Sequence, residues 1–134
     1  NKLELDGYLP DLIVHLEETY PFRDPGLIDG MIKRLMKDGF DSVIASKPEP
    51  GWIWHESSGK INRLDSGDIP REFKEKSLIG IHGLGCVTHA EFIRDGRILG
   101  NKIGLYMVNH PLASIEIRNN IPDHIAEKLL KNFI

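Results

Sequence analysis

Several features are scarce in this sequence, and each scarcity excludes a class of protein. The 134 residues include one cysteine, Cys86, so an internal disulfide is excluded. No apolar run approaches the ~20 residues that a membrane-spanning helix requires, and no signal peptide is visible. The net charge is only -3, with acids and bases mixed along the chain, which favours neither nucleic acid nor a membrane as partner. The lone cysteine fits a reducing compartment, and we expect a cytoplasmic location.

The remaining composition is that of a folded domain. Hydrophobic residues make up 40% of the chain, which is typical of a globular protein with a core. At this length we expect one domain that spans residues 1–134. The sequence contains no internal repeat and no low-complexity tract.

The most strongly patterned region predicts a strand, a helix and a second strand. Leu12 to Leu16 is almost entirely apolar, as in a strand that is covered on both faces. Asp24 can cap the helix that follows, and Gly39 can end it in the left-handed conformation. Ser42 to Ser46 is the next apolar strand, and because such a crossover joins parallel strands we expect an α/β fold with a mostly parallel, Rossmann-like sheet. The apolar stripe of the helix consists of Leu27, Ile28, Met31, Ile32, Leu35 and Met36.

The rest of the chain alternates polar turns with short apolar segments. Ser58-Gly59 is typical of a hairpin turn. Trp52 and Trp54 alternate along a short strand candidate, which favours packing or an interface. Further strands are expected at residues 78–81, 85–87 and 103–108, and helices at residues 88–94 and from Pro122 onward.

The loop after the first strand is the best candidate for a ligand-facing segment, because open α/β sheets gather ligand sites at the carboxyl ends of their strands. Within it, Arg23 lies beside the start of a helix whose N-terminus is partly positive. Arg23 and the helix are therefore a candidate anion site. The alternatives are a structural contact with Asp24 or a solvated charge.

This loop resembles that of the acylneuraminate/CMP-sialic acid synthetase-like cytidylyltransferases, which activate acidic sugars. In that family the loop reads roughly Leu-Gln-Pro-Thr-Ser-Pro-Leu-Arg. The matching residues are Leu16, Thr19, Pro21 and Arg23, with Phe22 a close substitute, whereas Glu17, Glu18 and Tyr20 depart.

Later segments resemble the same family in the same order. Lys102 to Val108 looks like its Lys-x-Tyr strand, and Ser114 to Arg118 falls where the family carries Ser-Ile-Asp-Ile-Asp. Ile69 to Lys74 resembles its Leu-Pro…Phe/Tyr-Arg segment, and Asp123 to Leu130 its closing helix. The resemblance runs from about residue 9 to residue 131.

The resemblance implies transfer of CMP from CTP to an acidic, sialic acid-like sugar with release of pyrophosphate. It also implies Mg²⁺ as cofactor and a homodimer built by a projecting segment at about residues 53–76. The family opens with a strand and a glycine- and lysine/arginine-containing loop that cradles the triphosphate. No such loop precedes Leu12, so we expect the later portion of such a domain, without its N-terminal strands and inactive by itself. A non-catalytic dimerisation module and a nucleotidyltransferase for a different sugar or base are the alternatives.

The resemblance assigns substrate contacts to Glu17, Thr19, Arg23, Lys74 and Arg118, and a metal ligand to Glu116; it assigns no catalytic residue. In the family, two aspartates at alternate strand positions hold Mg²⁺, and Glu116 and Arg118 stand at those positions. Glu116 keeps an oxygen ligand that suits Mg²⁺, whereas the fixed charge of Arg118 would repel a cation or contact phosphate directly. The alternative is a surface Glu/Arg pair.

The remaining assignments concern the sugar. Glu17 stands where the family has a glutamine that contacts the sugar. The negative charge of Glu17 would repel a sugar carboxylate, so if the loop still faces a substrate, we expect that substrate to differ from the family's. Lys74 lies where the family uses an arginine near the sugar acid. Solvated charges are the alternative for both residues. We expect Glu116 and Arg118 side by side at the mouth of the sheet, with Glu17 and Arg23 across the same cleft.

Overall fold

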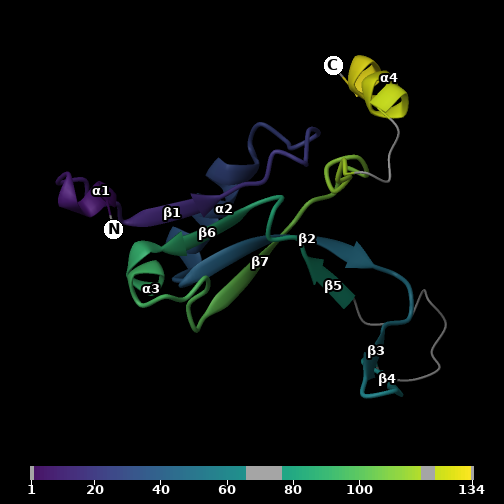
Figure 1. Ribbon diagram of the computed structural model, residues 1–134, viewed down its shortest axis with the longest axis horizontal. Helices are drawn as coiled ribbons and strands as arrows, with labels where there is room; N and C mark the ends of the chain where they lie inside the picture. The colour runs from purple at the N-terminus through teal and green to yellow at the C-terminus, as the bar shows by residue number, and fades with distance from the viewer. Residues whose placement is uncertain (1, 66–76, 119–122, 134) are drawn as a thin grey trace.

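The centre of the computed structural model, which describes residues 2–65, 77–118 and 123–133, is a five-stranded sheet (Figure 1). Strand β2 (Ser42–Glu49) pairs with three others, β5 (Ser77–Gly80), β6 (Cys86–His89) and β7 (Ile103–Met107). Strand β1 (Leu12–His15) pairs with β6 and forms an edge of the sheet. The fold is therefore α/β, as expected, with a mixed sheet.

The expectation of a mostly parallel, Rossmann-like sheet is not confirmed. Among the described strands, only β2 and β7 pair in parallel, whereas three pairings are antiparallel. β1 and β2 do run in the same direction, as the strand–helix–strand pattern predicts, but β6 lies between them. The sequence pattern predicts that β6 is apolar, but it carries no information on where that strand inserts.

β5 and β6 follow one another along β2, separated by a bulge of residues 81–85. The backbone of Ala45 closes the bulge, since its N–H donates to Gly85 O at 2.9 Å and its O accepts from Ile81 N at 2.7 Å. The residues between leave the ladder, and Gly83 O accepts a hydrogen bond of 2.8 Å from Glu17 N in the loop after β1. The bulge is thereby joined to the candidate ligand loop.

Helix α2 (Leu27–Asp38) covers the sheet with its apolar stripe. Asp24 does not cap it directly; its Oδ1 accepts from Gly26 N at 3.0 Å, and the helix begins one residue later. Gly39 ends it with φ 63°, which confirms the left-handed stop. Met36 departs from the expected face, with 67% of its surface exposed. The core comprises Tyr20, Leu27, Met31, Leu35, Val43, Ala45, Leu84 and Val87.

The hairpin β3 (Trp54–Ser57) and β4 (Lys60–Arg63) forms a separate two-stranded sheet that projects from the centre (Figure 1). Ser58 (φ 52°) and Gly59 (φ 75°) both have positive φ, as the favoured two-residue hairpin turn requires, so the predicted turn is confirmed. Of the expected projecting segment 53–76, residues 66–76, including Lys74, lie outside the described residues.

Three short helices complete the described chain: α1 (Lys2–Leu5), α3 (Ala90–Arg94) and α4 (Asp123–Phe133). α4 follows Pro122 as predicted. The helix expected at residues 88–94 begins only at Ala90, because Thr88 and His89 belong to strand β6. None of the described helices has the length and apolarity that a membrane span needs. The cytoplasmic location stays a prediction.

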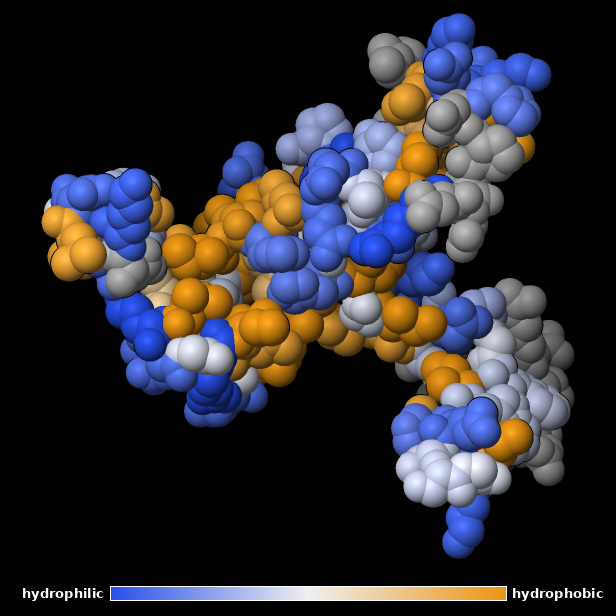
Figure 2. Space-filling model, in the orientation of Figure 1, coloured by the Kyte–Doolittle hydropathy of each residue, from blue (hydrophilic) through white to orange (hydrophobic). Residues whose placement is uncertain are grey.

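A broad apolar area covers the central sheet on the face shown in Figure 2. On the edge strand β1, Val14 keeps 37% of its surface exposed, and Leu16, which follows the strand, keeps 45%. Within the described ranges β1 pairs only with β6, so its other edge is open.

Candidate functional site

Glu17, Thr19, Glu116 and Arg118 form one cluster, named here the Arg118 cluster, where the loop after β1 meets residues 114–118. Arg118 Nη2 donates to Glu17 Oε2 at 3.2 Å, and Arg118 Nε donates to Glu116 Oε1. Thr19 Oγ1 donates to Glu116 Oε1 at 3.2 Å. Two carboxylates from distant parts of the sequence therefore hold one guanidinium between them.

The two segments of the Arg118 cluster are joined through their backbones. Ile117 N donates to Thr19 O at 2.7 Å, and a turn before it is closed by Ile115 N donating to Leu112 O at 3.0 Å. Residues 114–118 are irregular, so the expected strand with alternating side chains is wrong. Glu116 and Arg118 nevertheless lie side by side, because the guanidinium reaches back to the carboxylate rather than because of a strand pleat.

Arg23 lies next to the Arg118 cluster but binds the backbone. Its Nε donates to Leu84 O at 2.7 Å, and its Nη2 donates to Glu17 O at 2.7 Å and Gly83 O at 3.1 Å. This arrangement favours the structural alternative for Arg23, with carbonyl oxygens as partners in place of Asp24. Arg23 ties the ligand loop to the bulge and so positions Glu17.

Tyr20 lies beneath the Arg118 cluster and is 8% exposed. Burial, followed by the charges of Glu116 and Glu17, raises the pKa of its hydroxyl. The pKa of Glu116 is lowered, chiefly by the hydrogen bond from Arg118 and also by those from Thr19 and Tyr20. Glu116 is therefore ionised at neutral pH.

The Arg118 cluster does not fit a Mg²⁺ ion. Mg²⁺ requires several hard oxygen ligands in octahedral geometry. The carboxylates of Glu17 and Glu116 instead point at the guanidinium of Arg118, whose own pKa is raised chiefly by the hydrogen bond to Glu116. Within residues 2–65, 77–118 and 123–133, no three His, Cys, Asp or Glu side chains are grouped so that they could hold a metal.

Two histidines adjoin the Arg118 cluster, and the sequence analysis missed both. The His15 and His82 ring centroids are 4.3 Å apart, and His15 Nε2 lies 3.7 Å from Glu17 Oε1. Burial, followed by the charge of His15, lowers the pKa of His82. His15 lies two residues before Glu17 at the end of a strand, and this position could have identified it as a site residue from the sequence. Nothing in the sequence places His82 beside it.

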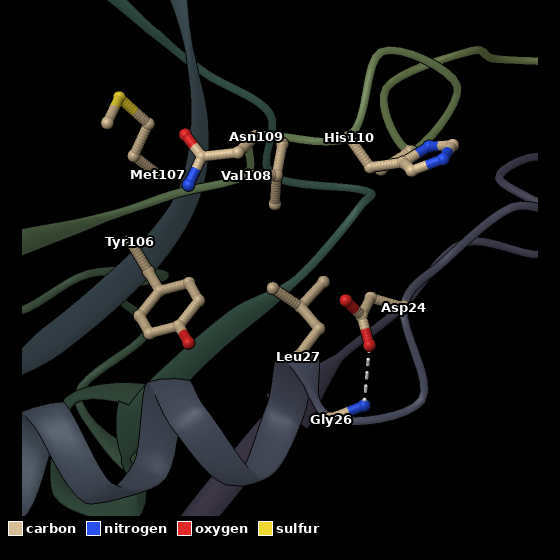
Figure 3. A pocket seen from close by; sticks show the side chains of 9 residues that line it. Asp24, Gly26, Leu27, Tyr106, Met107, Val108, Asn109 and His110 are labelled. Carbon is tan, nitrogen blue, oxygen red and sulfur yellow. Dashed lines mark hydrogen bonds between the residues drawn. The ribbon is translucent and has the colours of Figure 1, made fainter.

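The Arg118 cluster opens into a pocket of about 520 Å³, named here the sugar-loop pocket because the resemblance expects a sugar at the loop that lines it. A second pocket of about 480 Å³ lies between the end of β7 and the start of α2 (Figure 3). Asp24, Leu27, Tyr106 and His110 are among the residues that line the second pocket, and no predicted site residue from the described part of the chain lines it. The sugar-loop pocket is lined by Glu17, Glu18, Thr19, Ile117 and Arg118.

Of the six residues assigned from the resemblance, the structure gathers five. Glu17, Thr19, Glu116 and Arg118 are in contact, and Arg23 supports them from the bulge side. Comparison with models of protein families gives no match, and neither does a search of curated proteins. The resemblance to the cytidylyltransferases is therefore an expectation that rests on the residues themselves.

Proposed function

We propose that this chain is the sugar-binding portion of a nucleotidyltransferase that transfers CMP from CTP to a sugar. The observation that supports the proposal is the hydrogen bond between Thr19 and Glu116, which are 97 residues apart in the sequence. Each residue belongs to one of two segments that carry the family resemblance, and chance matches in sequence have no reason to meet in space.

In the proposed reaction the anomeric hydroxyl of the sugar attacks the α-phosphorus of CTP, and the bond to pyrophosphate breaks. The barrier to phosphoryl and nucleotidyl transfer is lowered mainly by positioning and charge neutralisation. The sugar-loop pocket would hold and orient the acceptor sugar through Arg118, Thr19 and the carboxylate of Glu17. The resemblance implies an acidic sugar, and a different sugar is the alternative that the charge of Glu17 favours.

These residues do not provide what a triphosphate needs, which is a set of backbone donors and free cations. Arg118 is paired with two carboxylates and Arg23 with carbonyl oxygens. We therefore expect these 134 residues to bind sugar but not to release pyrophosphate from CTP.

The experiment is a titration of the ¹⁵N-labelled chain with sugars, followed by amide NMR, combined with a pyrophosphate-release assay. Binding should shift the amides of Thr19 and Ile117, and Arg118→Ala should abolish those shifts. Sugar titrations that leave both amides in place would refute the proposal, and pyrophosphate release would refute the expected inactivity.

A second candidate is a non-catalytic dimerisation module. The projecting hairpin supports it, because Trp52 and Trp54 are each 55% exposed and Ile61 is 65% exposed. The two candidates differ in one measurement: a pure dimerisation module forms dimers but shows no sugar-dependent shifts at Thr19.

A further inference from the structure

The charges that face the sugar-loop pocket are mostly negative. Glu17 and Glu18 line it, and Glu116 lies directly behind Arg118. Arg118 is the only cation among the lining residues described, and Arg23 is turned toward the backbone carbonyls of the loop and the bulge. A carboxylate or phosphate that entered the pocket would meet more negative than positive charge, and repulsion between like charges opposes its binding.

The hydrogen-bonding groups of the pocket point to the same conclusion. A guanidinium carries five N–H groups, and the contacts of Arg118 to Glu116 and Glu17 run through Nε and Nη2. Nη1 donates to no residue in the described part of the chain, and the side chain is 62% exposed. Arg118 is therefore held in place by two carboxylates while it still presents donors to the pocket.

The same pocket is also lined by hydrogen-bond acceptors. The carboxylate of Glu17 is held by Arg118 through one oxygen, and Glu18 is exposed beside it. Ionised carboxylates only accept hydrogen bonds, so they need a ligand that donates. A sugar hydroxyl donates and accepts at once, whereas a carboxylate or phosphate group of a ligand only accepts. The size of the pocket, about 520 Å³, is typical of small-molecule sites.

We infer that the sugar-loop pocket binds an uncharged, hydroxyl-bearing sugar, with Arg118 donating to one sugar oxygen and Glu17 accepting from a neighbouring hydroxyl. This inference rests on the proposed function and narrows its substrate class. In this arrangement the hydroxyl groups of the sugar contact the pocket, and a sugar that carries a carboxylate there is excluded. Glu17 is the residue that determines this specificity.

The test uses sugar pairs in which one member carries a carboxylate and the other carries an uncharged group in its place, titrated into the ¹⁵N-labelled 134-residue chain. N-acetylneuraminate is compared with its methyl ester, and glucuronate is compared with glucose. The uncharged member of a pair should shift the amides of Thr19 and Ile117 with a Kd at least threefold lower than the charged member.

Glu17→Gln removes the charge and keeps an acceptor, so it should reduce this preference to less than about twofold. Glu56→Gln, which makes the same change on the exposed strand β3, is the matched control and should leave the preference intact. The amide spectrum of each variant reports whether the fold is retained.

Two results would overturn the inference, and they separate it from the proposed function. If the charged sugars bind more tightly than their uncharged partners, or equally well, the inference fails while the proposed sugar site stands. If neither member of any pair shifts Thr19 or Ile117, the proposed function fails together with the inference.

Discussion

Arg118 and Glu17 are 101 residues apart in the sequence, yet Arg118 Nη2 lies 3.2 Å from Glu17 Oε2. The same guanidinium also binds Glu116, so that a protein cation sits between two carboxylates. The resemblance implies Mg²⁺ at this place. A fixed guanidinium can hold two carboxylates together, but unlike a metal ion it does not offer exchangeable coordination positions to a ligand.

Replacing Arg118 should convert the cluster into a cation site. Arg118→Asp removes the repelling charge and adds a third carboxylate beside Glu17 and Glu116, so we expect Mn²⁺, used as a probe for Mg²⁺, to bind at least tenfold more tightly. Electron paramagnetic resonance of free Mn²⁺ measures this change.

The controls for Arg118→Asp separate a built site from a general gain of negative charge. Adding Glu116→Gln to Arg118→Asp should remove most of the gain. Arg97→Asp changes the charge equally at an arginine that donates to the side chain of Asn101 and lies over the Phe92 ring, so it should not produce the gain. Wild-type protein that binds Mn²⁺ as tightly as Arg118→Asp would contradict the prediction.

Loss of Arg23 should destabilise the protein. Arg23→Ala leaves the oxygens of Glu17, Gly83 and Leu84 without their charged donor, and we expect a loss of about 2–3 kcal/mol in the free energy of unfolding. Urea denaturation measures it. Arg34→Ala removes an exposed i,i+4 pair with Asp38 and a 5.9 Å contact of the guanidinium with the Phe40 ring, and it should cost less than about 1 kcal/mol. Equal losses for the two variants would show that the carbonyl contacts of Arg23 contribute little.

His82 should make the protein less stable in acid. Its pKa in the folded state is lowered from the ordinary 6.5, chiefly by burial, so the unfolded chain binds the proton more readily. The stabilising contribution is therefore complete above pH 6.5 and decreases as the pH falls from 6.5 toward the folded-state pKa. His15 adds to the lowering, and Glu17 opposes it.

Urea midpoints at about pH 7.5 and about pH 5.5, on either side of the ordinary histidine pKa, test this effect. The wild-type midpoint should be lower at the acidic pH than at the higher pH. The midpoint of His82→Gln should decrease by less, because its side chain cannot take up a proton. His55→Gln, on the exposed strand β3, should behave as wild type. If the midpoint of His82→Gln decreased between the two pH values as much as that of wild type, the prediction would be contradicted.

The projecting hairpin should mediate a homodimer. A two-stranded hairpin is marginally stable alone, and Trp52, Trp54 and Ile61 all expose more than half of their surface. Arg63 lies over the Trp52 ring at 4.3 Å and over the Trp54 ring at 5.9 Å, which keeps the two indoles on one face. Trp54→Glu should raise the dissociation constant of the dimer at least tenfold, measured by analytical ultracentrifugation. A wild-type molar mass that stays monomeric across a wide concentration range would exclude the dimer.

The local pattern of the sequence was sufficient for the elements that depend on neighbouring residues. The strand from Leu12, the end of helix α2 at Gly39 and the hairpin turn at Ser58-Gly59 all follow from apolar spacing and from the backbone preferences of glycine. The grouping of Glu17 with Glu116 and Arg118 was also expected, because the order of the segments matches a family in which they share one cleft.

What the sequence by itself determined about this protein is thus its α/β class and the type and place of several elements, among them helix α2 and the turn at Ser58-Gly59, whereas the roles of the site residues stay a prediction. Only the tertiary structure decided that β6 inserts between β1 and β2, that Arg23 serves three carbonyl oxygens, and that His82 stacks beside His15. The physical reason is that strand order and side-chain partners depend on contacts between distant residues. The bulge at residues 81–85, closed by Ala45, makes those contacts possible, and no local pattern encodes where such a bulge will meet the loop that carries Glu17.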